Sequence, residues 1–307
     1  MIKRIVILKH GGGELANQLW NYASVLAYGI DANVPVRNPS FYEYHRFFRF
    51  LKDEGAITKL RSLFFLKPRR RSSWISRNQR FKYALYAALA KKLCARSVYS
   101  SENSENKIVL LPPSEALPAR YDACARLYTT GWLFRNPAGF AKHADALRAA
   151  FKPTDQILQR VDTIMAPLRK SYDRIIGLHI RQSDYATFKG GKYLVSQELF
   201  REIAEEYIDE NGLVDAKTAF VIASDGPIDP SKFADLNIYV SKENSVVDLF
   251  LLSYTDAIIG SDSSFGAFAA WHGNIPHIIA KKGPMDWSYY AGKTTYFDNT
   301  YSELRTY

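Results

Sequence analysis

The stretch Ile175–Tyr185 reads IIGLHIRQSDY, and it decides the fold class of this chain. From Ile175 to Ile180 the run is apolar except for a glycine and a histidine, and polar residues follow at once. Such β-branched runs are typical of strands buried on both faces of a parallel sheet. In open α/β sheets, ligands bind at the carboxyl ends of the strands. The stretch therefore predicts a buried parallel strand that leads directly into a binding loop.

Three side chains at the end of this strand suit a phosphorylated ligand. Strand alternation places His179 and Arg181 on the same side, where both can reach one bound molecule. The guanidinium of Arg181 is a planar, permanently charged fork that matches phosphate oxygens. Asp184 adds a carboxylate three residues further on. The alternative is a structural ion pair between Arg181 and Asp184 that caps the strand.

The second half of the chain alternates between segments of strand and helix character. Strands are expected at 175–180, 219–223, 237–240, 257–260 and 277–280, and helices at 197–210, 246–254 and 263–273. This alternation predicts a nucleotide-binding type of parallel sheet with right-handed crossovers. Another helix is expected between residues 153 and 170, and the domain boundary is placed near its end.

The first half begins with a strand, a glycine turn and a helix. The strand is expected at Arg4–Lys9 and the helix at Asn17–Gly29. Gly11–Gly13 and Ala16 between them match the relaxed dinucleotide fingerprint G-x-G-x-x-A. Arg37 stands where that fingerprint expects an acidic residue, which favours a different ligand and leaves NADP as a minority alternative. A tight structural turn is the other interpretation of the glycines.

Further polar residues lie at the ends of predicted elements. Asp225 follows the strand at 219–223, where its carboxylate can accept hydrogen bonds from a purine or a ribose. The alternative is that Asp225 only marks a turn. Ser263 and Ser264 open a predicted helix, and their hydroxyls with the first backbone N–H groups suit a diphosphate. Ser263 also suits a plain N-cap. Asn17 begins the first helix, where a carboxamide can hydrogen-bond the oxygens of a ligand.

The positive charge of the chain is concentrated in one segment. The net charge is +10, and Arg61–Ser100 holds eleven Lys or Arg and no Asp or Glu. Within it, Phe81–Arg96 resembles an amphipathic interfacial helix, and the alternative is a solvated basic face over a core-facing helix. This composition favours contact with an anionic membrane or another polyanion. We expect peripheral membrane contact through residues 61–100, and nucleic acid is not expected as a partner.

Length, composition and cysteine content indicate the general class of protein. A chain of 307 residues predicts two domains, and 47% hydrophobic with 23% charged residues is typical of soluble globular proteins. Cys94 and Cys124 form no motif, which favours thiols in a reducing compartment. With no apolar run of the ~20 residues that span a bilayer, and no signal peptide, we expect a cytoplasmic protein, peripheral on the inner face of the plasma membrane.

Several catalytic signatures are absent from the sequence. It contains no Walker A loop, no G-x-S-x-G elbow, no H-E-x-x-H motif and no D-x-D pair. Phosphate binding is therefore expected to rest on arginine and on helix N-termini, and no metal site is expected.

Taken together, these stretches resemble the GDP-fucose-dependent fucosyltransferases, most closely the bacterial α-1,2-fucosyltransferase family, glycosyltransferase family 11. That family pairs an N-terminal Gly-Gly-x-Gly-Asn-Gln-type start with a central His-x-Arg-Arg-Gly-Asp-Tyr motif. The corresponding stretches here are GGGELANQLWNYA and HIRQSDY. Further similarity lies in TTGWLF, KYLVSQELFREIAEEYI, ASDG, DLFLLSYTDAIIGSDSSFGAFAAW and IPHIIAKK. The order and spacing span nearly the whole chain, and the segment 61–106 is matched least.

The resemblance implies a GT-B-like α/β architecture, in which two Rossmann-like domains face each other across a cleft. Residues 1–170 would form the acceptor-side domain, with a basic helical insertion at 61–106, and residues 171–307 the GDP-fucose-binding domain. The implied reaction is the inverting, metal-independent transfer of L-fucose from GDP-fucose to a glycan or lipid-linked oligosaccharide, as in lipopolysaccharide or O-antigen biosynthesis. No cofactor beyond this donor substrate is implied.

The resemblance also implies roles for individual residues. Arg181 would hold the β-phosphate and stabilise its growing charge. His179 and Asp225 would contact guanine, and Asn17 would face the transferred sugar. The nucleotide would also be lined by Gly12, Gly13, Ser263, Ser264 and Phe265.

Departures from the family pattern keep alternatives open. Gln182 replaces the second family arginine, Ser183 replaces the glycine, and the usual Ser-Phe-Ser-Trp-Trp run reads SFGAF. Loss of one cation leaves open a donor other than GDP-fucose, or a nucleotide-sugar-binding protein that kept the fold without turnover. An inverting transfer also needs a base for the acceptor hydroxyl, for which Asp184 and Glu14 are the candidates and His10 a weaker one.

Overall fold

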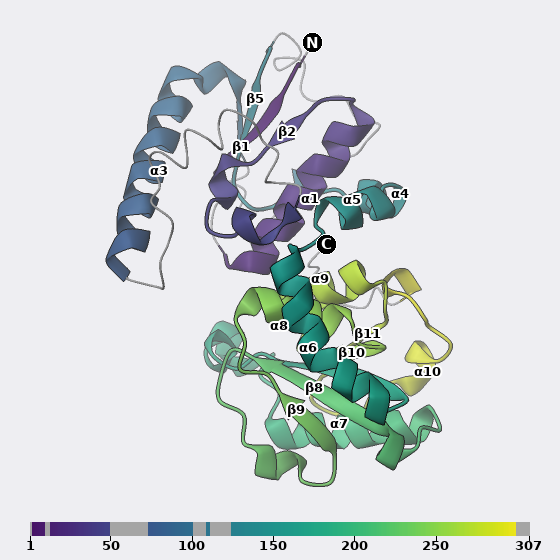
Figure 1. Ribbon diagram of the computed structural model, residues 1–307. Coiled ribbons are helices and arrows are strands. Elements are labelled where there is room, and N and C mark those ends of the chain that lie inside the picture. Colours follow the sequence, from purple (N-terminus) through teal and green to yellow (C-terminus); the bar gives the residue numbers. More distant parts are fainter. Residues whose placement is uncertain (1, 10–12, 50–72, 101–108, 111–123, 299–307) are drawn as a thin grey trace. The chain divides into compact units, whose positions relative to one another are not determined.

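The computed structural model describes residues 2–9, 13–49, 73–100, 109–110 and 124–298 (Figure 1). The chain divides into two compact units, residues 1–154 and 155–306. The boundary expected near residue 170 is therefore too late. Helix α6 (Asp155–Ser171) packs against strand β7 (Arg174–Ile180) and helix α8 (Ser245–Ser253), and these contacts place it in the second unit.

The second unit contains a five-stranded parallel sheet in the order β11-β10-β7-β8-β9. Besides β7, its strands are β8 (Thr218–Ser224), β9 (Asn237–Val240), β10 (Ala257–Gly260) and β11 (His277–Ile279). These observed strands confirm the five that the sequence predicts. Counted along the chain the order is 5-4-1-2-3, the doubly wound arrangement of nucleotide-binding folds. The order reverses between β7 and β10, and such sheets bind ligands at the carboxyl ends beside this switch point.

Side chains of β7 alternate between the two faces of this sheet. Its even-numbered residues join a core with α7 (Gln197–Glu210), which Figure 1 shows below the sheet. Its odd-numbered residues face α8 and α9 (Ser264–Gly273), and a Cβ on Gly177 would lie 2.8 Å from Leu252 of α8. His179 belongs to this second face, and it therefore points toward the helix that follows β10.

Helices α7 and α8 begin at residues whose side chains accept hydrogen bonds from their first N–H groups. The hydroxyl of Ser196 accepts a hydrogen bond from the Leu199 N–H at 3.2 Å, which starts α7. The carboxamide oxygen of Asn244 accepts from the Val246 N–H at 3.0 Å, which starts α8. A short helix, α10 (Trp287–Tyr290), follows β11.

The first unit contains a second parallel sheet in the order β2-β1-β5-β3. Its strands are β1 (Ile5–Lys9), β2 (Val36–Arg37), β3 (Val98–Ser100) and β5 (Leu127–Thr130), and a separate parallel pair is formed by β4 (Val109–Leu110) and β6 (Phe134–Arg135). The strand–turn–helix start is confirmed, because β1 is followed by α1 (Leu15–Asp31).

The other helices of the first unit are α3 (Ser73–Leu93), α4 (Pro137–Lys142) and α5 (Ala144–Ala150). Helix α3 begins before the expected segment 81–96 and ends three residues earlier. The core of this unit is rich in aromatic residues, and the buried rings of Trp20 and Phe140 lie 4.9 Å apart. This packing joins α1 to α4.

Candidate functional site

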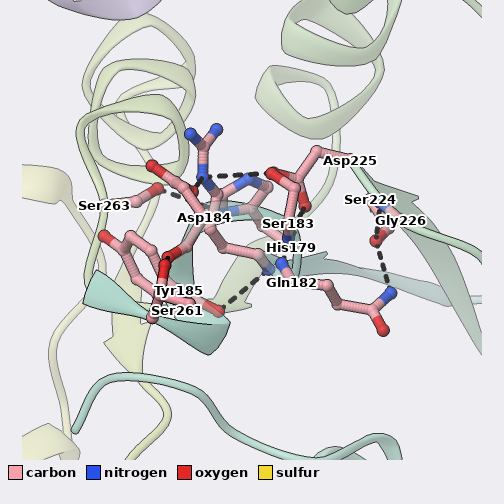
Figure 2. A network of polar contacts seen from close by, with 12 residues as sticks. His179, Gln182, Ser183, Asp184, Tyr185, Ser224, Asp225, Gly226, Ser261 and Ser263 are labelled. Carbon is pink, nitrogen blue, oxygen red and sulfur yellow. Dashed lines mark hydrogen bonds and ion pairs between the residues drawn. The ribbon is translucent and has the colours of Figure 1, made fainter. Parts of the chain in front are cut away.

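Three loops meet at the carboxyl edge of the second sheet (Figure 2). Strand β7 continues into residues 181–184, β8 ends just before Asp225, and β10 continues into residues 261–263. Because β7 is hydrogen-bonded to β8 on one side and to β10 on the other, these loops are neighbours although they are far apart in sequence. They lie at the switch point of the sheet, where ligands bind in this fold.

Arg181 is held in this loop by two carboxylates. Its Nε donates a hydrogen bond to Asp184 Oδ1 at 2.8 Å and lies 3.2 Å from Asp225 Oδ2, and its backbone N–H donates to Ser261 Oγ at 3.0 Å. Burial disfavours its charge, but the two carboxylates outweigh burial and raise the pKa of Arg181. Among the described residues, its two terminal nitrogens donate no hydrogen bond. The ion pair with Asp184 is therefore present, and it engages Nε and not the terminal nitrogens of the guanidinium.

Asp225 organises the loop that follows β7. Its carboxylate accepts the N–H groups of Gln182 at 2.7 Å and Ser183 at 3.4 Å, and the hydroxyl of Ser183 donates to its other oxygen. Burial alone would raise the pKa of Asp225, but these hydrogen bonds and the charge of Arg181 lower it below its usual value. A contact between Asp225 and guanine stays a prediction.

Gln182, where the family that the sequence resembles has a second arginine, is part of the same framework. Its Nε2 donates to Ser224 Oγ at 2.9 Å and to the Pro227 carbonyl at 2.9 Å, as Figure 2 shows for Ser224. Its Oε1 accepts from Gln197 Nε2 at 3.2 Å. The side chain therefore links the loops after β7 and β8 to the start of α7, and it adds no charge to the site.

His179 lies buried beside the start of α9, with 4% of its surface exposed. Its Nδ1 is 3.4 Å from Ser263 Oγ, and its ring stacks on Phe265 with centroids 5.1 Å apart. Burial, reinforced by the charge of Arg181, lowers the pKa of His179 to about 4, so the ring is neutral near pH 7. His179 thus supports the helix terminus, and its contact with guanine stays a prediction.

A second buried imidazole, His277, lies next to His179 and was missed by sequence reasoning. A Cβ on Gly266 would lie 2.9 Å from His277 Nε2 and 3.1 Å from His179 Nδ1, so the glycine makes room for both rings. His277 Nε2 has no hydrogen-bond partner among the described residues, and burial with the nearby His179 lowers its pKa to about 3. The sequence shows His277 only as the first residue of the last predicted strand. It becomes a neighbour of His179 because β11 pairs with β10.

The residues at the start of α9 lie where the sequence predicts them. Ser263 is in the N-cap position, but its side chain accepts no cap hydrogen bond and instead lies against His179. The backbone at the start of α9, at Ser264 and Phe265, therefore receives no cap hydrogen bond from the Ser263 side chain. The positive end of the helix dipole favours an anion at this point.

The candidates of the first unit gather at the start of α1. Glu14 precedes the helix and accepts a hydrogen bond from the Tyr44 hydroxyl at 3.2 Å. Gly13 has φ of 80°, and a Cβ there would lie 2.6 Å from Asn17 Nδ2. Glycine therefore serves both the turn and the close approach of Asn17. Gly12 and His10 lie outside the described residues.

Arg135 is a further residue that sequence reasoning missed. The side chain is buried, and it forms no ion pair with a carboxylate in the described part of the chain. One terminal nitrogen donates to the carbonyls of Trp132 at 2.7 Å and Phe134 at 3.0 Å, and burial lowers its pKa to about 10. This guanidinium fixes the turn that presents the partly exposed Trp132, and the Gly131 N–H ties the same turn to the end of β1.

Neither a metal-binding cluster nor a membrane-spanning helix is present among the described residues. None of their His, Cys, Asp and Glu side chains forms a group of three or more that could hold a metal ion. Within the same ranges, no helix combines the length and the apolar character that crossing a membrane requires.

No protein-family model matches the chain, and no curated protein sequence does. Solved structures share its fold. A mutant of Arabidopsis thaliana FUT1 in complex with GDP is 15% identical, with a TM-score of 0.51 over 92% of this chain and 72% of that chain. NodZ alpha-1,6-fucosyltransferase soaked with GDP-fucose is 15% identical, with a TM-score of 0.50 over 89% and 94%. POFUT1 in complex with GDP is 8% identical, with a TM-score of 0.50 over 91% and 99%.

At these identities the likeness shows the fold alone. It covers both units of the chain, and each unit contains a parallel sheet, which the sequence predicts for the second half. The chain therefore has a mixed α/β, GT-B-like fold.

Proposed function

We propose that this protein is an inverting glycosyltransferase that transfers L-fucose from GDP-fucose to a hydroxyl group of a glycan or lipid-linked oligosaccharide, in α-1,2 linkage. The observation that carries the proposal is Arg181 at the switch point, where Asp184 and Asp225 both engage Nε and the terminal nitrogens remain for an anion. The likeness in fold to structures that hold GDP or GDP-fucose supports the donor class. The family resemblance of the sequence supports the linkage.

Arg181 and α9 would stabilise the leaving group. Cleavage of the bond between fucose and the β-phosphate leaves negative charge on GDP. A fixed guanidinium that donates parallel N–H bonds to phosphate oxygens stabilises this charge as it develops. The amino-terminal end of α9, at Ser264 and Phe265, adds the positive end of a helix dipole. Because arginine supplies the positive charge, the proposed transfer needs no metal ion, and full activity in EDTA would support this.

Glu14 and Asn17 are the residues that we propose for the base and for the sugar contact. In an inverting transfer the acceptor oxygen attacks the anomeric carbon opposite the diphosphate while a base removes its proton. Asp184 is engaged by Arg181, whereas Glu14 accepts a hydrogen bond from Tyr44 and pairs with no cation in the described ranges. Glu14 is therefore the stronger candidate for the base. Asn17, which lies beside Gly13, would hydrogen-bond the transferred sugar.

A second candidate function is nucleotide-sugar binding without turnover, or transfer from another nucleotide sugar. The observation that favours it is Gln182, which stands at the position of the second family arginine and is directed toward Ser224 and Pro227. The diphosphate would then be held by a single guanidinium. A protein without turnover would bind GDP-fucose but release no GDP with any glycan acceptor.

The proposed location is the cytoplasm, at the inner face of the plasma membrane. A lipid-linked oligosaccharide acceptor would be presented at that face. The excess of basic residues in 61–100 supports a peripheral protein there.

A panel of nucleotides tests the donor class directly. We would measure the melting temperature of the purified protein with GDP, GDP-fucose, GDP-mannose, UDP, UDP-glucose and NADPH, because a ligand of the folded state raises this temperature. Stabilisation by GDP and GDP-fucose is the expected result. Stabilisation by the uridine nucleotides or NADPH alone, or by no nucleotide, would contradict the proposal. GDP release on addition of a β-galactoside acceptor would then separate a transferase from a binding protein.

A further inference from the structure

Helix α3 exposes large apolar side chains on one side. Phe81, Leu85, Leu89 and Leu93, which we call the outer stripe, are 69%, 54%, 52% and 83% exposed. They recur every four residues, so they follow one another along a single side of the helix. A contiguous apolar surface of this kind marks an interaction site more often than scattered exposed residues do.

The opposite side of α3 is anchored to the first sheet. Tyr83, Ala87 and Ala90 pack in one cluster with Val6 and Leu8 of β1, and the Tyr83 hydroxyl donates to the Leu8 carbonyl. The helix therefore cannot rotate to bury the outer stripe without losing this core. A helix that is apolar on both sides needs a second apolar partner.

The charge near the outer stripe indicates the nature of that partner. Lys91 and Lys92 are exposed in the last turn of α3, Arg96 is exposed just beyond it, and Arg61–Ser100 contains no acidic residue. A second copy of the chain would bring like charges together, which disfavours self-association through this side. The partner must offer an apolar interior to the outer stripe and negative charge to the basic residues. An anionic lipid bilayer has both properties.

We propose that α3 is a membrane-docking helix, which inserts the outer stripe among the acyl chains of an anionic bilayer while the neighbouring lysines contact the headgroups. This inference concerns a surface separate from the candidate nucleotide site. It holds whichever sugar nucleotide the protein binds, because none of its residues belongs to the loops around Arg181.

Vesicle sedimentation with the full-length protein tests the proposal. The vesicles are phosphatidylcholine with phosphatidylglycerol in a seven-to-three ratio, compared with pure phosphatidylcholine. The expected result is binding to the anionic vesicles, a partition coefficient at least about tenfold lower for Leu89→Ser/Leu93→Ser, and a similar loss for Lys91→Glu/Lys92→Glu. Val214→Ser is the matched control, because it removes a 63% exposed apolar side chain from the second unit and should leave binding unchanged.

Two outcomes would overturn the proposal. The first is equal vesicle binding by wild type and Leu89→Ser/Leu93→Ser, when both have the same melting temperature. The second is a wild-type dimer in light scattering that the same double variant converts to a monomer, because the outer stripe would then be covered by a second copy of the chain. Equal GDP-induced stabilisation of all variants shows that the nucleotide site is intact, so failure here is distinct from failure of the proposed function.

Discussion

Replacement of Arg181 by alanine is expected to weaken GDP binding while leaving the fold intact. Each terminal nitrogen of this guanidinium is available for a charge-assisted hydrogen bond to a phosphate oxygen, and such a bond contributes about 1.5 kcal/mol. With two bonds, and a discount for a side chain that is 25% exposed, the loss should be about 2–3 kcal/mol. This corresponds to an increase in Kd of about 30- to 150-fold.

The fold should tolerate this change because the carboxylates around Arg181 keep other partners. Asp225 still accepts the N–H groups of Gln182 and Ser183, and Asp184 is more than half exposed to water. Arg181→Lys keeps the charge but loses the planar fork, so we expect an intermediate affinity for GDP.

Isothermal titration calorimetry with GDP and with guanosine separates a phosphate contact from a general defect. Guanosine carries no phosphate, so its affinity should be the same for wild type and Arg181→Ala. The matched control is Arg169→Ala, which removes a guanidinium that pairs with Asp256 at 2.7 Å. Asp256 also accepts a hydrogen bond from the Ile175 N–H, so this pair lies at the amino end of β7, away from the loop that holds Arg181. This control should bind GDP like wild type. Unchanged GDP affinity in Arg181→Ala, or an equal loss for guanosine, would refute the assigned role.

Three further predictions concern the base and the buried imidazoles. Glu14→Gln should reduce kcat by about 100-fold or more and leave donor affinity unchanged, whereas Asp184→Asn should mainly raise the donor KM. If steady-state kinetics show the reverse pattern, Asp184 is the base. Gly266→Ala places a Cβ 2.9 Å from His277 and 3.1 Å from His179, so the free energy of unfolding should fall by about 1–3 kcal/mol; an unchanged urea midpoint would contradict this packing. In the folded state the pKa values of His277 (about 3) and His179 (about 4) lie below the ordinary value of 6.5. Below pH 6.5 the unfolded state therefore binds more protons than the folded state. The two histidines thus lower the free energy of unfolding as the pH falls toward 4. His277→Gln should therefore reduce the slope of unfolding free energy against pH by up to about 1.4 kcal/mol per pH unit, and equal slopes in urea titrations would show that His277 does not titrate this way.

Local sequence was enough to find the strands and the loops that carry the site. The β-branched runs of β7 and β8 are visible without any partner, and a change from apolar to polar residues marks the end of each strand. Arg181 and Asp184 are three residues apart, so their ion pair at 2.8 Å is a local interaction. The resemblance of the motifs to known fucosyltransferases added a fold that the similar solved structures confirm.

The partners of these residues were not predictable from local sequence. Asp225 accepts N–H groups from the loop after β7, and Gln182 reaches Ser224, because β8 lies next to β7. His277 becomes a neighbour of His179 because β10 lies between their strands. Each contact joins segments that are separated by tens of residues, and nothing in either segment alone names the other.

The sequence by itself determined which segments form strands, where polar groups leave the second sheet, and that one basic segment is set apart in charge. Only the tertiary structure decided the strand order, the hydrogen bonds of Asp225, the neighbours of His277, the position of α6 in the second unit, and the outward side of α3. The physical reason is that periodicity and propensity are local, whereas strand neighbours and helix faces are chosen by the burial of apolar surface between distant parts of the chain.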